Sequence, residues 1–223
     1  MLRVFNTQKR YLQRKVNYIR PLTMTSFDTT TKTTNTNSNP LLTEWNDKYG
    51  LPPFADIKHS HYKDAISYAC QEHINEVNAI ASNSSEPTFD NTIASYDRSG
   101  SLLNKILGVF YNLTSSDCPP ELQKVQMELS GPLAEHQNKI ITTPGMFKRI
   151  QIIYDNRINI STEACDMTPS VTSTVSLADE KLRLIERIHL NFIREGAKFD
   201  TEAQNRYKEL VIKLAGYISN RQS

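Results

Sequence analysis

The chain has 223 residues, which is enough for one domain with a sizeable core. Its composition is 38% hydrophobic and 22% charged with only 7 glycines, which favours long helices over turn-rich β architecture. Six of the 26 basic residues lie in residues 1–27, and this segment holds no acidic residue. The rest of the chain therefore has 20 basic and 24 acidic residues and is mildly acidic. This balance argues against a nucleic-acid-binding surface. No run of about 18 apolar residues occurs, so no membrane-spanning helix is expected.

The cysteines predict reduced thiols rather than a disulfide framework. Cys70, Cys118 and Cys165 are odd in number and far apart, and no C-x-x-C pair occurs. We therefore expect an intracellular protein without a cysteine-ligated zinc.

Residues 1–27 have the composition of a targeting sequence. They are basic and acid-free, and as a helix they would be amphipathic, with Leu12, Val16 and Ile19 on one face and Arg10, Arg14 and Asn17 on another. Such a segment is typical of a mitochondrial presequence, so a mitochondrial location is expected. In the alternative, the segment is a disordered extension and a start at Met24 leaves the protein in the cytoplasm.

Residues 28–38 form a linker rich in Thr and Asn that has almost nothing to bury, so we expect it to be disordered. The folded body, residues 39–223, is expected to begin with an extended strap over Asn39–Phe54, because its prolines fix the backbone and remove hydrogen-bond donors. Trp45 and Phe54 are expected to anchor this strap on the helices behind it. A Pro-rich recognition peptide is the alternative, although P-x-x-P repeats are absent.

The rest of the body predicts successive helices, because apolar residues recur at helical spacing in at least six segments and strand alternation is absent. The expected helices run from the Ser60 cap to about 81, from the Thr88 cap to about 113, from 118–120 to the loop at 142–145, through 147–154, from 177 to 195 and from 201 to about 219. Loops of the observed length favour antiparallel packing, so the fold class is an all-α, antiparallel multi-helix bundle. Thr162–Ser176 is rich in Thr and Ser with weak periodicity and is predicted to be a surface loop.

Several residues mark where these helices begin and end. Ser60, Thr88 and Asp200 are candidate N-caps, and Asn91 at N3 after Thr88 is weaker than the Glu or Gln of a full capping box. Gly196 suits the position after a helix end. The Ser99-Gly100 pair predicts either a break in the second helix or a close contact between helices.

The histidines do not predict a metal site. A catalytic zinc needs three converging protein ligands, and ligands on one helix need a spacing of four residues. His59 and His61 are two apart, and none of the five histidines, which include His73, His136 and His189, has another four residues away. His136 and His189 lie on apolar helical faces and are expected to be hydrogen-bonded structural residues.

Other catalytic patterns are also missing. The pairs Glu72/Glu76 and Glu128/Glu135 are expected to be solvated charges. The sequence contains no G-x-S-x-G, P-loop or G-x-G-x-x-G motif and no local Cys/His pair, so neither nucleophilic catalysis nor nucleotide binding is supported. No catalytic, cofactor-binding or metal-binding residue is assigned in this chain.

A series of ordered sequence blocks carries the strongest information about ancestry. The blocks are NPLLTEW at Asn39–Trp45, GLPPFADIK at Gly50–Lys58, His61-Tyr62, PTFDNTIASYDRSGSLLNKILGVFYNL at Pro87–Leu113, SGPLAEHQNKI at Ser130–Ile140, FKRIQIIYDNR at Phe147–Arg157 and FIREGAKFD at Phe192–Asp200. In this order and at nearly this spacing, the set resembles the N-terminal half of the thimet oligopeptidase and peptidyl-dipeptidase (oligopeptidase A-like) family of zinc metallopeptidases.

The resemblance implies a peptidase acting on short peptides, in which the N-terminal helices form one wall of a channel. It also implies a zinc held by an H-E-x-x-H helix in the C-terminal half. This sequence has no H-E-x-x-H, so we expect no zinc in the chain and no peptidase activity from it by itself. The alternative is a free-standing helical module that binds peptides or a partner protein and cuts nothing.

The sequence departs from the family pattern in several places. Asp64 stands where the family has Pro, the Thr162–Ser176 segment resembles an insertion, and the likeness fades after Lys208. We expect a chain truncated before the catalytic domain, whose partners are short peptides or the missing catalytic half. The last helix would then expose an apolar stripe and allow self-association through Leu210, Val211, Leu214 and Ile218. In the alternative, the stripe packs on the chain's own bundle.

Overall fold

The computed structural model describes residues 39–45, 49–157 and 177–220. Every regular element in these ranges is a helix, which confirms the all-α prediction. The predictions for the 1–27 presequence, the 28–38 linker, the Thr162–Ser176 loop and Cys165 concern residues outside the described ranges. No helix within these ranges has the length and apolar character needed to cross a membrane.

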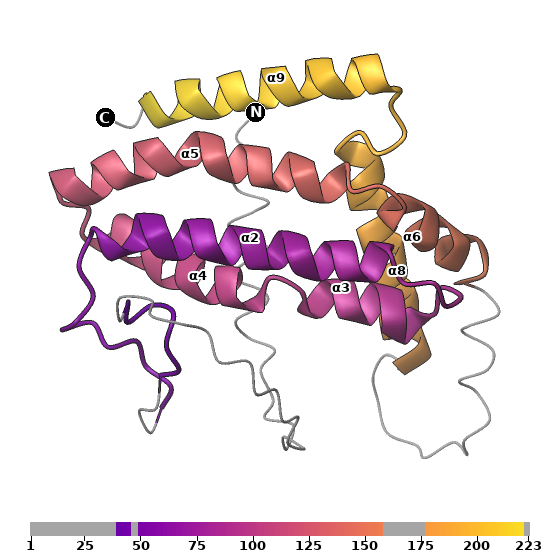
Figure 1. Cartoon of the computed structure of the whole chain (residues 1–223), viewed down its shortest axis with the longest axis horizontal. Coiled ribbons are helices and arrows are strands. Elements are labelled where there is room, and N and C mark those ends of the chain that lie inside the picture. Colours follow the sequence, from indigo (N-terminus) through magenta and orange to yellow (C-terminus); the bar gives the residue numbers. More distant parts are fainter. Residues whose placement is uncertain (1–38, 46–48, 158–176, 221–223) are drawn as a thin grey trace.

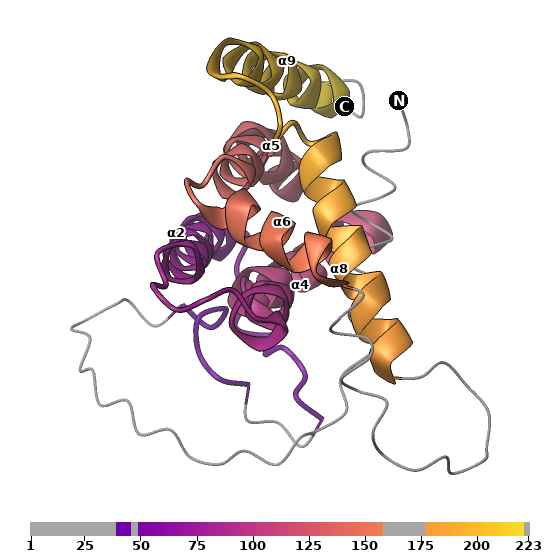
Figure 2. The same cartoon turned by 90° about the vertical axis from the view of Figure 1, so that its right-hand side faces the viewer.

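The long helices form a layered bundle closed at one end by two further helices. In chain order the elements are α2 (His61–Ala81), the π-helix η1 (Phe89–Ala94), α3 (Ser95–Arg98), α4 (Ser101–Ser116), α5 (Pro120–Ile141), α6 (Met146–Asp155), α8 (Leu177–Arg194) and α9 (Thr201–Asn220). Figure 1 shows that α4 runs back along α2, that α5 lies along the other side of α2, and that α9 runs back along α5. Helices α6 and α8 lie at one end, and α8 crosses the direction of the long helices (Figure 2).

Two of the three predicted N-caps are present. The Thr88 hydroxyl accepts a hydrogen bond from the Asn91 N–H at 3.2 Å, and the Thr88 N–H donates to Asn91 Oδ1 at 2.9 Å, so Asn91 completes a full capping box. Asp200 Oδ1 accepts from the Ala203 N–H at 2.7 Å. The prediction for Ser60 is wrong, because its backbone is already helical (φ −65°, ψ −24°) and its side chain makes no capping bond.

The predicted helix over 88–113 is interrupted at Ser99-Gly100. Gly100 has φ +67° and separates α3 from α4, and its N–H donates to the Glu76 carboxylate of α2 at 2.6 Å. A left-handed backbone is strained for residues with a Cβ, so glycine permits the break. The segment before it begins as a π-helix, which the apolar periodicity did not predict.

The core consists of two apolar clusters that share helices α2 and α5. The first joins the start of α2, α4 and the start of α5, and its largest fully buried side chains are Leu41, Tyr62, Ile66, Ile106, Phe110 and Leu122. The second joins the end of α2, η1, the end of α5, α6 and α8, and its largest fully buried side chains are Ile93, Ile140, Met146, Ile150, Ile153 and Phe192.

The strap is anchored by Trp45, as predicted, and by Leu41, which was not predicted. Leu41 is fully buried in the first cluster, and Trp45 packs partly against it while its Nε1 donates to the Pro40 carbonyl at 3.1 Å. Lys105 of α4 places its ammonium 3.7 Å from the centre of the Trp45 ring. Phe54 is 50% exposed, so its predicted anchoring role is wrong.

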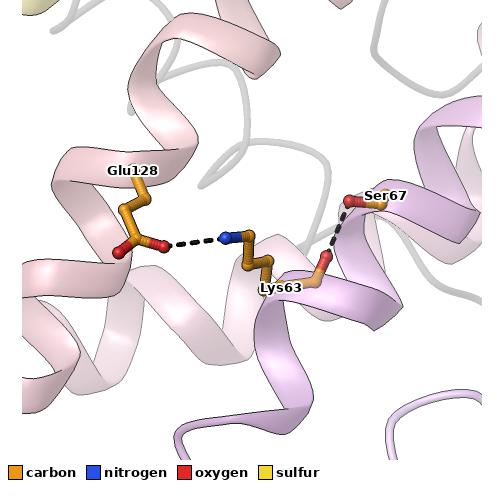
Figure 3. Close-up of polar contacts among 3 residues, drawn as sticks. All are labelled: Lys63, Ser67 and Glu128. Carbon is orange, nitrogen blue, oxygen red and sulfur yellow. Dashed lines mark hydrogen bonds and ion pairs between the residues drawn. The ribbon is translucent and has the colours of Figure 1, made fainter.

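Polar contacts connect elements that are distant in sequence. Lys63 Nζ of α2 lies 3.0 Å from Glu128 Oε2 of α5 (Figure 3). Both side chains are largely exposed, so this pair adds little stability.

The Arg149 side chain on α6 is buried and joins three segments. Its guanidinium donates to the Asn83 and Ser85 carbonyls at 2.6 and 3.0 Å and to Asn91 Oδ1 at 3.1 Å, while its Nε donates to Thr92 Oγ1 at 3.3 Å. These neutral acceptors tie the loop after α2 and the π-helix to α6.

Helix α9 packs along α5, which covers only part of its apolar surface. Val211 is half-buried, whereas Leu210 and Leu214 are 57% and 40% exposed, and the Ile218 side chain lies outside what the structure describes. Tyr217, 73% exposed, extends the outward apolar surface. The sequence offered two alternatives for α9, packing on the bundle and an exposed apolar stripe. Both are present, on different sides of the helix.

Candidate functional site: a polar layer between the two apolar clusters

A pair of histidines lies where the two apolar clusters meet. On α2, His73 falls between Ala69 of the first cluster and Val77 of the second, and on α5, His136 falls between Leu129 and Ile140. The two imidazole rings approach to 5.0 Å between centroids. Sequence reasoning placed His136 on an apolar helical face but could not pair it with His73, because the two residues lie on separate helices.

His73 also contacts the break between α3 and α4. Its Nε2 lies 3.2 Å from Ser99 Oγ, and Ser99 Oγ donates to the Tyr96 carbonyl at 2.7 Å. Gly100 sits against the same ring, since a Cβ at this position would lie 2.7 Å from His73 Nδ1. Both readings of Ser99-Gly100, a break and a close contact between helices, are therefore confirmed.

Burial disfavours the charged form of His136. Its side chain is 6% exposed, and burial, the neighbouring His73 and Lys139 together lower its pKa from 6.5 to about 4. Its Nε2 has no hydrogen-bond partner among the described residues, so the prediction of a fully hydrogen-bonded structural histidine is wrong for His136.

The serine next to His73 is not arranged as a nucleophile. An activated serine donates its proton to the base, whereas the Ser99 hydroxyl proton is directed to the Tyr96 carbonyl. The 3.2 Å contact between Ser99 Oγ and His73 Nε2 is the longer of the two, so it does not direct the serine proton to the imidazole. The geometry supports a polar, proton-sensitive junction between helices.

The residues present do not fit a zinc ion. A catalytic zinc takes three protein ligands and a water, and within residues 39–45, 49–157 and 177–220 no three His, Cys, Asp or Glu side chains converge. The His73–His136 pair supplies two imidazoles at most. No step of a metal-assisted reaction is therefore assigned to this part of the chain.

The other histidines lie apart from this pair. His189 on α8 is buried, its Nε2 lies 2.9 Å from Gln151 Oε1, and its ring stacks on Tyr154 with a centroid separation of 3.7 Å. The prediction of a hydrogen-bonded structural histidine is confirmed there. His59 is exposed, and His61 Nδ1 accepts from the Lys58 N–H at 3.1 Å.

The predicted roles of the acids and cysteines are only partly right. Glu76 was expected to be merely solvated, but its carboxylate accepts from Gly100. Glu128 pairs with Lys63, and Glu135 with Lys139 at 3.3 Å. Cys70 is a free thiol on α2, and burial raises its pKa to about 11, so it is not a reactive thiolate at neutral pH.

Comparison with known proteins relates the chain to peptidases. No protein-family model matches it. It is 31% identical over 184 residues to the dipeptidyl carboxypeptidase of Escherichia coli K12, and 30% identical over 182 residues to that of Salmonella typhimurium LT2. Each alignment covers 82% of this chain and 25% of the relative, so the chain spans about a quarter of the length of the curated relatives it matches. These similarities support a peptidase family for this chain.

Proposed function

We propose that the chain is the N-terminal helical part of a zinc metallopeptidase that cleaves short peptides, of the thimet oligopeptidase and peptidyl-dipeptidase kind. The observation that carries the proposal is the similarity to two dipeptidyl carboxypeptidases over 82% of the chain. In this proposal the metal and the catalytic groups belong to a portion that the chain does not contain.

A chimera tests this proposal. The aligned quarter of the Escherichia coli enzyme would be replaced by residues 39–223 of this chain, and cleavage of a fluorogenic peptide would be measured with and without a chelator. We expect chelator-sensitive cleavage from the chimera, none from the chain alone, and none from the enzyme lacking that quarter. An inactive but folded chimera, or chelator-sensitive cleavage by the chain alone, would contradict the proposal.

A non-catalytic helical module that binds peptides or a partner is the second candidate. It is favoured by one observation, the outward apolar surface of α9 formed by Leu210, Leu214 and Tyr217. In this proposal the surface supports self-association or a partner contact. The chimera separates the two candidates. Only the peptidase candidate predicts that this chain can replace the aligned quarter of the enzyme and restore cleavage.

We also propose a mitochondrial location, supported by the basic, acid-free residues 1–27. A C-terminal fluorescent tag on the full chain, compared with a Met24 start, tests it. Mitochondrial signal that is lost in the shorter form is expected, and equal cytosolic signal from both forms would contradict it.

A further inference from the structure

The outward face of α8 carries a stripe of arginines. With about 100° of rotation per residue, Arg183, Arg187, Leu190 and Arg194 fall within about 60° of one another around the helix. They lie opposite the buried positions Ile185, Ile188 and Phe192. All four outward residues are exposed, and Leu190 is 42% exposed. In Figure 2, α8 lies at one edge of the described part of the chain.

The arginines on this face make no ion pair with the described residues. Among the described residues, the one ion pair that involves α8 joins Glu186 to Arg157 at 3.7 Å, and none involves Arg183, Arg187 or Arg194. From Arg183 to Arg194 the stripe extends for about 16 Å, or three helical turns. No acidic residue occupies the same arc within that length.

We propose that this α8 stripe, Arg183, Arg187, Leu190 and Arg194, is a docking surface for an acidic amphipathic helix of a partner protein. Guanidinium groups pair bidentately with carboxylates, and their spacing of four and seven residues matches carboxylates at helical spacing on a partner. Leu190 provides an apolar contact inside the charged stripe. The proposal does not depend on peptidase function.

The charges elsewhere in the molecule favour this occupant over others. The chain outside residues 1–27 carries 24 acidic and 20 basic residues, so it lacks the broad basic surface that is typical of binding to nucleic acids and anionic membranes. The stripe is one helix face wide, which matches a single acidic helix.

Fluorescence anisotropy with the full chain tests the proposal. The labelled peptide would be a capped helix of about 18 residues with Glu at positions i, i+4, i+7 and i+11 and Leu beside them, and a scrambled peptide of equal composition would serve as its control. We expect the designed peptide to bind and Arg187→Glu to weaken its binding by about tenfold, with a smaller loss for Arg187→Lys. Leu190→Ala should weaken binding by about threefold without changing its salt dependence.

Arg98→Glu on α3 is the matched control, because Arg98 is an exposed arginine of equal charge that lies beside Glu76 and Ile80 of α2 and not in the α8 stripe. It should change binding by less than about twofold if the stripe is the site. Circular dichroism checks that every variant remains folded. Equal binding of the scrambled peptide, an equal loss in Arg98→Glu, or no binding by about 1 mM peptide would overturn the proposal. So would tighter, Arg187-dependent binding to phosphatidylserine vesicles or to single-stranded RNA.

Discussion

At the scale of single residues, Gly100 is held by two independent constraints. Its φ of +67° lies in the left-handed region, and a Cβ there would meet the His73 ring at 2.7 Å from Nδ1. The neighbouring backbone is fixed by the Gly100–Glu76 hydrogen bond. A side chain at this position must therefore distort either the break or the histidine layer.

We expect Gly100→Ala to lower the free energy of unfolding by more than about 2 kcal/mol, combining left-handed strain with the clash. Gly108→Ala is the control, since Gly108 lies inside α4 with no atom within 4 Å of an added Cβ. It should stabilise the protein by up to about 1 kcal/mol through helix propensity. Urea unfolding followed by circular dichroism measures both, and equal effects would contradict the argument.

The buried His136 makes stability depend on pH. Because its pKa is about 4 in the fold and 6.5 ordinarily, the unfolded chain binds more protons between these values. Stability should therefore fall as the pH drops from 6.5 to 4, by about 3 kcal/mol at most. Burial raises the pKa of Glu195 above its ordinary value of 4.5. Above pH 4.5 this group therefore has the opposite effect, because its contribution to stability increases as the pH falls.

His136→Leu tests this prediction, because it removes the titrating group and keeps an apolar side chain at the site. We expect the variant to lose less stability than the wild type between pH 7 and pH 4.5, measured by urea unfolding at each pH. His59→Leu changes an exposed histidine and should leave the slope as it was. Parallel pH profiles for the wild type and His136→Leu would show that another group controls acid unfolding.

At the scale of elements, α9 presents different surfaces to α5 and to the outside. Tyr207 packs edge-on against Phe199 with centroids 5.9 Å apart, and burial and the charge of Glu195 raise the Tyr207 pKa. This end of the helix is thus held against the bundle. Farther along, Leu210, Leu214 and Tyr217 face outward.

We expect Leu214→Glu to reduce self-association of the chain and to cost less than about 1 kcal/mol of stability, because Leu214 is 40% exposed. Size-exclusion chromatography with light scattering measures the association. Tyr68→Glu, at a 45% exposed site on α2, controls for added charge. A monomeric wild type that Leu214→Glu strongly destabilises would mean that the helix buries this residue in solution.

At the scale of the whole molecule, the two apolar clusters share α2 and α5, so they are expected to unfold together. Trp45 is the chain's one tryptophan and packs against the first cluster, whereas Ile153 is 1% exposed in the second. Fluorescence of Trp45 can therefore report on damage made in the other cluster.

Ile153→Ala should lower the free energy of unfolding by about 3 kcal/mol and should shift the Trp45 fluorescence and circular dichroism midpoints equally. Its neighbour Ile152 is 38% exposed, so Ile152→Ala should lower the free energy of unfolding by less than about 1 kcal/mol by either probe. A Trp45 transition that stays in place while the dichroism midpoint falls would mean that the clusters unfold separately.

The sequence by itself determined the helices and several of their boundaries, because these depend on contacts between neighbours in the chain. Apolar spacing predicted α2, α5, α8 and α9, and the caps at Thr88 and Asp200 act over three residues. The cap predicted at Ser60 is absent because capping requires a non-helical backbone at that residue, and the residue type does not fix the backbone conformation.

Only the tertiary structure decided which apolar faces meet. The contact of His73 with His136 and the hydrogen bonds from Arg149 to Asn83 and Asn91 join residues from separate segments. Periodicity shows that a face is buried but not against which helix, so these contacts could not be derived from spacing. The outward arginines of α8 could be found by spacing, but their exposure depends on what packs over them, and that is decided by the fold.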